Sequence, residues 1–494
     1  MKGQALNPYL PINVCIPDGE PHVFGDRVYI YGSHDKEGGE KFCILDYEVY
    51  SAPVNDLSAW ESHGIVYKAK QDPAYSEKYR YMYAPDVVRG NDGRYYLYYC
   101  LAGGSFTGPI HVAVCDTPAG KYEYYGEVCN KDGSRFWRNV TFDPAVINDE
   151  GTIRLYYGWA LALDADRRPK AFEESFSEEL IQVEEWMFEK TREEILMEKE
   201  SLMGAFTVEL SDDMLTVLTE PKRIVPGQFD SFGTQFEKHA FFEASSIRKI
   251  RDTYFFIYSS EQEHELCYAT SKYPDSEYAY RGTIISNGDI GYQGRKADER
   301  LNATGNNHGS IEKINGKWYV FYHRPTHGNL YSRQGCAEEI SVDSNDRINQ
   351  VEMTSCGLNG GSLLTDGEYS ALICCNLTNG KMPHLTTEKI AEEIPCITSE
   401  GEERYIAHIT DKTLIGYKYF SFNKMTNLKV KLRGDEGILK VNIGNQDTSV
   451  VLHESKDWHE VLITVAANGT YPIYMSYCGD GEINVKSFRF EKGN

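Results

Sequence analysis

The chain has 494 residues, of which 41% are hydrophobic and 13% aromatic, and its 74 acidic against 51 basic residues leave a formal net charge of −23. A chain of this length is expected to form two or three domains, and its 36 Tyr and 21 Phe argue against a disordered acidic protein. The negative charge argues against a binder of nucleic acid or of an anionic membrane, because phosphates would be repelled.

Neither the N-terminus nor the cysteines indicate export. Residues 1–10 hold one Lys and no apolar stretch of signal-peptide length, and no run of 18 apolar residues could span a membrane. The twelve cysteines show no Cys-x-x-Cys spacing and no Cys/His ladder, so we expect reduced core thiols rather than a zinc or redox motif. These features favour a cytoplasmic protein, or a secreted one if a signal peptide has been removed.

A short hydrophilic turn followed by an aromatic, β-prone strand occurs five times, in residues 24–33, 91–99, 149–158, 251–259 and 315–323. Each copy follows another short apolar segment, so each unit is predicted to be a β-hairpin whose second strand carries the aromatic side chains. Repeats separated by about 60–100 residues suit sheets of several strands, and the pattern predicts a five-bladed β-propeller. A β-sandwich with many hairpins is the alternative.

Residues 165–203 interrupt this β pattern. They are rich in Glu and carry apolar residues at helical spacing, among them Phe176, Leu180, Val183 and Ile195. The spacing predicts a helical insertion. It either covers a pocket or joins subunits, or it is a solvated surface hairpin with one packed apolar face.

After about Glu352 the aromatic repeats stop, and residues 353–399 contain Gly, Asn, Thr and Ser clusters typical of connecting structure. Short alternating strands resume in residues 400–494 and predict a small antiparallel β-sandwich. The predicted fold is therefore all-β, with a five-bladed propeller in residues 1–352, a connecting segment in 353–399 and a β-sandwich in 400–494.

Ionisable side chains stand just before the first strand of all five hairpins: Asp18, Asp86, Asp143, Glu243 and His308. In a propeller the first strands converge on the central axis, so these side chains would meet in one pocket. An acid before Pro or Gly is commonly an ordinary turn residue, but the recurrence at one place in successive repeats favours a shared site. Converging carboxylates are costly unless they share protons, bind a cation or do chemistry.

Two carboxylic acids, one protonated and one ionised, are what cleavage of a glycosidic bond requires. Glu243 lies between Phe242 and Ala244, and such apolar surroundings should raise its pKa, which suits a proton donor. Asp18, on a different blade across the axis, would then activate water. Asp143 would hold the pKa of Glu243 high through the proximity of like charge and help to orient it.

Other residues are candidates for substrate or metal contacts. Trp137, Trp159 and Phe242 could stack on sugar faces, with core packing as the alternative. His308 is either a hydrogen-bonded core histidine or a ligand to a hydrated cation on the axis. Arg333 could bond a sugar hydroxyl, steady an acid or form a surface ion pair. We count Asp86 among the substrate contacts.

Together these motifs resemble glycoside hydrolase family 43 over about residues 7–345: Asp18 in Pro-Asp-Gly, Asp86 in Ala-Pro-Asp-Val, Asp143 in Phe-Asp-Pro-Ala-Val, Glu243 in Phe-Glu-Ala-Ser and His308 in His-Gly-Ser. The resemblance implies a five-bladed propeller that hydrolyses β-xylosides, α-L-arabinofuranosides, arabinans or galactans with inversion. One departure is Gly19-Glu20, where many members have Pro-Ser, which places a spare acid beside the base.

The resemblance also implies roles for individual residues. Asp18 would be the general base, Asp143 the pKa modulator and orienting acid, and Glu243 the general acid. Arg333, in Ser-Arg-Gln-Gly-Cys-Ala, would contact substrate. His308 would sit beside a structural calcium reached largely through water, whereas the chemistry itself requires no cofactor.

The C-terminal region, roughly residues 400–494, resembles the family 6 type of carbohydrate-binding module through Trp458-His-Glu-Val and Ser487-Phe-Arg-Phe490. A packing-only appendage is the alternative. We therefore expect an inverting glycosidase, a β-xylosidase or α-L-arabinofuranosidase, acting on pentose-containing oligosaccharides. The alternatives are a non-catalytic carbohydrate-binding propeller, a retaining glycosidase, or a glycosidase of other specificity such as galactan or fructan. The sequence leaves the oligomeric state open.

Overall fold

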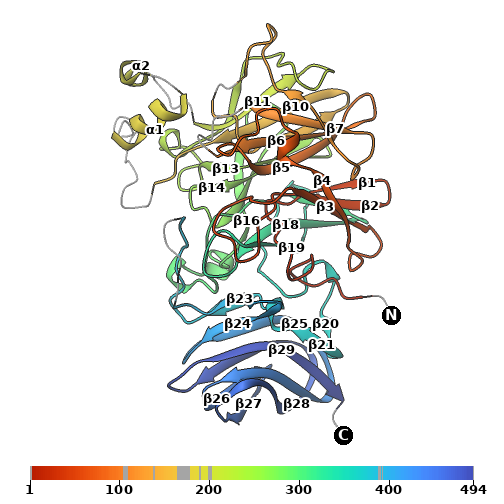
Figure 1. The fold of residues 1–494 in the computed structure, drawn as a ribbon, viewed down its shortest axis with the longest axis vertical. Helices are drawn as coiled ribbons and strands as arrows, with labels where there is room; N and C mark the ends of the chain where they lie inside the picture. The colour runs from red at the N-terminus through yellow and green to blue at the C-terminus, as the bar shows by residue number, and fades with distance from the viewer. Residues whose placement is uncertain are drawn as a thin grey trace.

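The computed structural model describes residues 3–103, 109–136, 139–163, 178–188, 191–197, 203–387, 391 and 393–492. Two β-rich parts lie one above the other along the longest axis of the molecule (Figure 1). The upper part contains strands β1 to β19, and the lower part contains β20 to β29, which form one large curled sheet.

The upper part consists of five separate antiparallel sheets, each following the chain from strand to strand. The first sheet comprises β1 (Glu20–Phe24), β2 (Arg27–Tyr31), β3 (Tyr47–Pro53) and β4 (Glu61–Tyr67). The second comprises β5 (Tyr81–Arg89), β6 (Tyr95–Ala102), β7 (Ile110–Cys115) and β8 (Glu123–Glu127). The third comprises β9 (Ala145–Asp149), β10 (Thr152–Trp159), β11 (Gly204–Leu210) and β12 (Lys222–Pro226). The fourth comprises β13 (Phe241–Ile250), β14 (Thr253–Ser260), β15 (Glu265–Ser271) and β16 (Ala279–Ser286), and the fifth β17 (Ile311–Ile314), β18 (Lys317–Pro325) and β19 (Arg333–Ile340).

Five hydrophobic cores lie between neighbouring sheets and close them into a ring. One core joins sheets one and two, and the next three join each following pair. The last joins sheet five back to sheet one, where Phe321 and Ile30 are both fully buried. A parallel bridge between Gly19 and Gly309 also links these two sheets. The predicted five-bladed propeller is therefore confirmed, and the aromatic second strands supply its inter-blade packing.

The predicted helical insertion lies between β10 and β11. Its described part contains α1 (Glu178–Phe188) and α2 (Arg192–Leu196), while most of residues 165–203 fall outside the described ranges. Thr191 and Glu194 form a capping box that starts α2, and Arg192 pairs with Glu178 of α1 at 2.7 Å. In α1, Ile181 is buried, which fits a surface hairpin with a packed apolar face.

The C-terminal strands form one ten-stranded sheet in the order β23-β24-β29-β25-β28-β26-β27, with β20 and β22 added to β25 and β21 added to β29. Its core includes Tyr369, Tyr417, Phe420 and Phe488. The strands are β20 (Leu363–Leu364), β21 (Gly367–Ser370), β22 (Asn376–Thr378), β23 (Cys396–Glu400), β24 (Glu403–Ile409), β25 (Leu414–Gly434), β26 (Gly437–Ile443), β27 (Gln446–Leu452), β28 (Ser455–Cys478) and β29 (Ile483–Lys492). Part of the predicted connecting segment thus belongs to this sheet.

Short 3-10 turns complete the described structure: η1 (Ala69–Gln71), η3 (Gln228–Asp230), η4 (Tyr292–Gly294), η5 (Ala297–Glu299), η6 (Gly357–Asn359) and η7 (Ala371–Ile373). None of the described helices is long and apolar enough to cross a membrane. All twelve cysteines, each within the described ranges, are free thiols. The two parts of the molecule are joined by Arg324 of β18, whose guanidinium donates to the carbonyls of Leu372 and Cys374.

Candidate active site

A cavity of about 400 Å³ opens on the axis of the propeller, where the first strands of the blades begin. It is lined by Asp18, Asp143, Glu243, His308, Trp159 and Arg333. Phe242 also contributes to its wall. Of the predicted site residues that the structure describes, all except Asp86 therefore line one cavity.

Backbone conformation aims the three acids at the cavity. Asp18 and Asp143 adopt left-handed φ angles of 56° and 44°, which are uncommon for residues with a Cβ atom. Glu243 sits where β13 changes register against β14, and Ala244 beside it has a φ of 70°. A bulge of this kind redirects a side chain out of the regular alternation of a strand. Such conformations cost roughly 1–3 kcal/mol each and concentrate at functional sites.

Asp18 is held as an anion. Its Oδ1 accepts a hydrogen bond from Arg333 Nη1 at 3.0 Å and lies 3.2 Å from His323 Nδ1. Burial alone would raise the pKa of Asp18, but the Arg333 guanidinium and His323 lower it well below its usual value. Asp18 is therefore ionised at neutral pH, as a general base requires.

Glu243 and Asp143 have the opposite tendency. Burial, then the charges of Glu263 and Asp18, raises the pKa of Glu243 to about 8. Burial and the neighbouring Glu243 raise the pKa of Asp143 well above its usual value as well. The Ala244 amide donates to Asp143 Oδ2 at 3.0 Å and favours the ionised form of Asp143. The proton that these two carboxyls retain near neutral pH is thus best placed on Glu243.

His308 lies between the two aspartates. Its Nδ1 is 3.6 Å from Asp143 Oδ2 and 4.0 Å from Asp18 Oδ1, and burial lowers its pKa to about 4, so the ring is neutral at pH 7. Calcium prefers six to eight oxygen ligands. Among the described His, Cys, Asp and Glu side chains, no group of three ligand atoms within 4.8 Å of one another includes His308. The calcium near His308 stays a prediction.

Aromatic side chains form one wall of the cavity. Trp159, at the end of β10, and Phe242, in β13, both line it, with ring centroids 6.2 Å apart. The Arg333 guanidinium lies 4.7 Å from the ring centroid of Phe42, a further residue of the cavity wall that the sequence did not single out. Trp137 lies outside the described residues.

Arg333 mainly holds the base. Besides Asp18, it donates to Asp35 from Nε at 2.8 Å and from Nη2 at 3.1 Å, and the side chains of all three residues are at most 5% exposed. Of the three roles considered for Arg333, the contacts favour the one in which it steadies an acid. No local motif points to Asp35, which lies in the loop after β2.

Asp86 does not reach the cavity wall. It is fully buried, and its carboxylate accepts hydrogen bonds from the amides of Val87 and Val146 and contacts His22 Nε2 at 2.6 Å. The expectation that Asp86 contacts substrate is therefore corrected, because no surface of its side chain is exposed. The spare acid Glu20 is likewise not among the residues that line the cavity, and it pairs with Arg248 at 3.0 Å.

The cavity wall contains further residues that the sequence analysis did not single out. Tyr83, Glu263, Asn306 and the pair 386–387 contribute to it. Asn306 precedes His308 in the same motif and Tyr83 precedes Asp86, so proximity in sequence was an available signal for these two. Glu263 lies in the β14–β15 turn and carried no such signal.

An ionised carboxylate and a protonated one, facing a common cavity on the axis of a five-bladed propeller, define a glycoside hydrolase of the two-carboxyl type. Comparison with known proteins agrees with this class. Glycosyl hydrolases family 43 matches residues 10–171. A xylosidase/arabinosidase of Thermoclostridium stercorarium is 42% identical over 99% of both chains, and a xylosidase/arabinosidase of Bacteroides ovatus is 30% identical over 70% of this chain and 97% of its own.

Solved structures extend the likeness. CoXyl43, a β-xylosidase/α-arabinofuranosidase from a compost microbial metagenome in complex with xylotriose, is 25% identical with a TM-score of 0.52, covering 71% of this chain and 98% of its own. An arabinoxylan arabinofuranohydrolase from Bacillus subtilis covers 99% of this chain and 97% of its own at 18% identity and a TM-score of 0.50, which shows the fold alone. The chain belongs to glycosyl hydrolase family 43 and is an inverting glycoside hydrolase.

Proposed function

We propose that this enzyme removes xylose or arabinose residues from pentose-containing oligosaccharides, with Asp18 as general base, Glu243 as general acid and Asp143 as the acid that tunes Glu243. The observation that carries this proposal is the opposite protonation of two carboxyls in one cavity. The pKa of Asp18 is lowered, through Arg333, while that of Glu243 is raised to about 8. The xylosidase/arabinosidase relatives support the choice of sugars.

The proposed reaction is a single displacement. Glu243 donates its proton to the glycosidic oxygen as the bond between that oxygen and the anomeric carbon breaks. Asp18 takes a proton from a water molecule on the opposite face of the sugar, and the water oxygen bonds to the anomeric carbon, which inverts its configuration. Arg333 keeps Asp18 ionised and fixed. Trp159 and Phe242 offer apolar faces against which a sugar ring can pack.

The decisive test compares wild type with Glu243→Gln on nitrophenyl β-xyloside, nitrophenyl α-L-arabinofuranoside and xylobiose. Loss of a general acid should lower kcat by about 10²–10⁴-fold, with the smallest loss on nitrophenyl substrates, whose leaving group needs little protonation. Glu261→Gln, in the same blade, is the matched control, because Glu261 bonds Gln228 and is not among the described residues that line the cavity. Undiminished activity on xylobiose would remove Glu243 as the acid.

Product configuration separates the alternatives. NMR of the first turnover products should show the inverted anomer. A retained anomer would indicate a retaining glycosidase, in which the second carboxylate attacks the sugar directly. Calorimetric binding of xylotriose without any product would instead indicate a non-catalytic binding propeller. Hydrolysis of galactan or fructan alone would move the specificity outside pentoses.

We infer further that the C-terminal sheet acts mainly as a packing module. The residues behind its likeness to a family 6 carbohydrate-binding module are engaged within the sheet. Phe488 and Phe490 lie in its core. Trp458 packs against Arg433 and Lys486, and its Nε1 donates to Glu403, so the indole is engaged by neighbours within its own sheet. Binding of xylan or arabinan that survives blocking of the propeller cavity would contradict this inference.

A further inference from the structure

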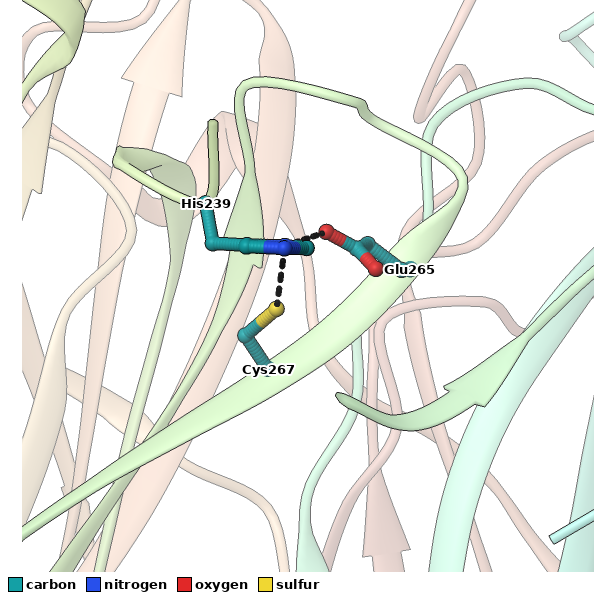
Figure 2. Close-up of side chains that lie close together, drawn as sticks. All are labelled: His239, Glu265 and Cys267. Carbon is teal, nitrogen blue, oxygen red and sulfur yellow. Dashed lines mark hydrogen bonds and ion pairs between the residues drawn. The ribbon is translucent and has the colours of Figure 1, made fainter. Parts of the chain in front are cut away.

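Three side chains with metal-ligating atoms converge in blade four, at a site distinct from the acids of the cavity. Figure 2 shows the ring of His239, the carboxylate of Glu265 and the thiol of Cys267 pointing toward one another. One ligand atom of each lies within 4.8 Å of the other two. Neither His239, Glu265 nor Cys267 is used by the reaction described above.

Strand geometry explains the convergence. Glu265 and Cys267 stand two residues apart in β15 and therefore point to the same face of the sheet. His239 lies just before β13 and is held in place by its neighbours. Its carbonyl accepts from the Tyr258 hydroxyl at 2.7 Å, and its ring stacks on Tyr280 with centroids 4.9 Å apart and planes 14° apart. The three donors thus converge before any ion arrives.

A second layer of hydroxyls orients the donors. Glu265 Oε1 lies 2.7 Å from His239 Nδ1 and accepts from Ser260 Oγ at 2.6 Å, while its Oε2 accepts from Thr283 Oγ1 at 2.7 Å. Cys267 Sγ lies 3.9 Å from His239 Nδ1 and 3.7 Å from Thr283 Oγ1. Such outer partners are typical of metal sites, where they set the orientation of each ligand.

We propose that His239 Nδ1, a Glu265 carboxylate oxygen and Cys267 Sγ bind one zinc ion, with water in the fourth position. A nitrogen, oxygen and sulfur set suits zinc and argues against calcium or magnesium, which prefer oxygen alone. Tetrahedral zinc with bonds of about 2.0–2.3 Å places its ligand atoms roughly 3.3–3.7 Å apart. His239 Nδ1 lies 2.7 Å from Glu265 Oε1 and 3.9 Å from Cys267 Sγ, which bracket that range, so these two separations need adjustments of less than about 1 Å.

Charge balance supports a divalent ion. Glu265 supplies a carboxylate whose two oxygens accept hydrogen bonds from the Ser260 and Thr283 hydroxyls. On binding, the Cys267 thiol proton leaves to solvent, and the His239 ring carries its single proton on Nε2, so that Nδ1 offers a lone pair from a neutral ring. Zinc with one thiolate and one carboxylate is then neutral, which suits a buried site.

An ion can reach the site, and its binding would have a structural effect. The side chain of His239 is 35% exposed, whereas Glu265 and Cys267 are buried. His239 stands four residues before Glu243 in the chain. A zinc ion would therefore fasten the segment that enters β13, and with it the start of the strand that carries Phe242 and Glu243, to β15, which lies two strands away in the same sheet.

The test uses the full chain, stripped of metal with a chelator and titrated with Zn²⁺ by calorimetry and with Co²⁺ by absorption. One equivalent should bind, with a thiolate-to-cobalt charge-transfer band in the near ultraviolet. Cys267→Ser should abolish that band. Cys115→Ser is the matched control and should keep it, because Cys115 ends β7, the equivalent strand of blade two, and its sulfur contacts only Thr117 among the described hydrogen-bond partners.

Two further measurements, of thermal stability and of anomalous diffraction, test the same zinc site independently of the charge-transfer band. His239→Ala, at the most exposed ligand, should remove the increase in Tm that one equivalent of Zn²⁺ gives to wild type. Anomalous diffraction at the zinc edge, from wild-type crystals soaked in Zn²⁺, should show a peak between the three side chains. A charge-transfer band that persists in Cys267→Ser, an increase in Tm unchanged in His239→Ala, or an anomalous peak only elsewhere would overturn the site.

Discussion

Glu263 should control the pH range over which the enzyme works, although it does no chemistry. It lies in the β14–β15 turn with a φ of 62°, and its side chain lines the cavity into which Glu243 projects. Its charge is the largest contribution after burial to the raised pKa of Glu243. Its Oε2 lies 3.0 Å from His384 Nε2, and Glu263→Gln keeps a group that can hydrogen-bond there while removing the charge.

The sign follows from the role of Glu243. A general acid must be protonated, so kcat/KM falls as the pH rises through its pKa of about 8. Without the Glu263 charge that pKa is lower, and the alkaline limb of the profile moves to lower pH. A nearby charge changes a carboxyl pKa by about 1–3 units. The Glu263 side chain is 32% exposed and therefore screened, so we expect a movement of about 0.5–1 pH unit.

The assay is the pH dependence of kcat/KM on xylobiose, where protonation of the leaving group matters most. Glu261→Gln changes the charge by the same amount, two residues away and outside the cavity, and should leave the alkaline limb in place. A limb that stays fixed in Glu263→Gln, or moves to higher pH, would refute the electrostatic reasoning. If the alkaline limb moved equally in Glu263→Gln and Glu261→Gln, the movement would be an effect of net charge and not of the position of Glu263.

Three further predictions concern the site and its support. Arg333→Met leaves the buried carboxylates of Asp18 and Asp35 without their cation, so the free energy of unfolding should fall by about 3–5 kcal/mol in urea titrations. The pKa of Asp18 should also rise, and the acid limb of kcat/KM should therefore move to higher pH. Trp159→Ala removes a cavity wall, and KM should rise about tenfold, equivalent to about 1.4 kcal/mol, with a smaller change in kcat. Phe488→Ala empties the core of the C-terminal sheet and should cost about 3–5 kcal/mol by chemical denaturation.

The repeat pattern contained enough information to predict the propeller. Each hairpin depends on local features, a turn residue followed by a run of Tyr, Phe and Ile. Such features can be recognised in the sequence without knowing which distant residues are in contact. Tyr98 and Tyr157, from two of these runs, meet in the core between blades two and three. The same reasoning placed Asp18, Asp143 and Glu243 at equivalent positions, where the ring brings them together.

Equivalent position did not guarantee an equivalent direction. Asp86 lies within the first strand of blade two, as Glu243 lies within the first strand of blade four, and both of these strands change register nearby. Glu243 nevertheless faces the cavity, while Asp86 turns to the amides of Val87 and Val146. The direction of a bulged side chain depends on which neighbouring donors hydrogen-bond to it. For Asp86 one of these donors, the Val146 amide, belongs to another blade, so the local sequence does not indicate the direction.

Asp35, His239 and Cys267 carried no signal in the sequence because they contact their partners from distant parts of the chain. Asp35 accepts a hydrogen bond from Arg333, which lies 298 positions later in the chain. Cys267 and His239, 28 positions apart, show none of the short spacings that indicate metal sites. A sequence without an alignment carries no signal for such pairs, because their contact depends on how whole blades pack.

The connecting segment shows why the C-terminal sheet belongs to the catalytic unit. Its strand β22 pairs with β25, and a few residues later His384 forms a parallel bridge with Thr304, in the loop that leads to His308. From there His384 reaches Glu263, and residues 386–387 line the cavity. The wall that sets the charge around Glu243 is thus fixed from both parts of the molecule. A sheet that only shielded the propeller would not need a connecting segment that lines the cavity. The segment around residues 384–387 therefore couples the packing of the C-terminal sheet to the chemistry of the site.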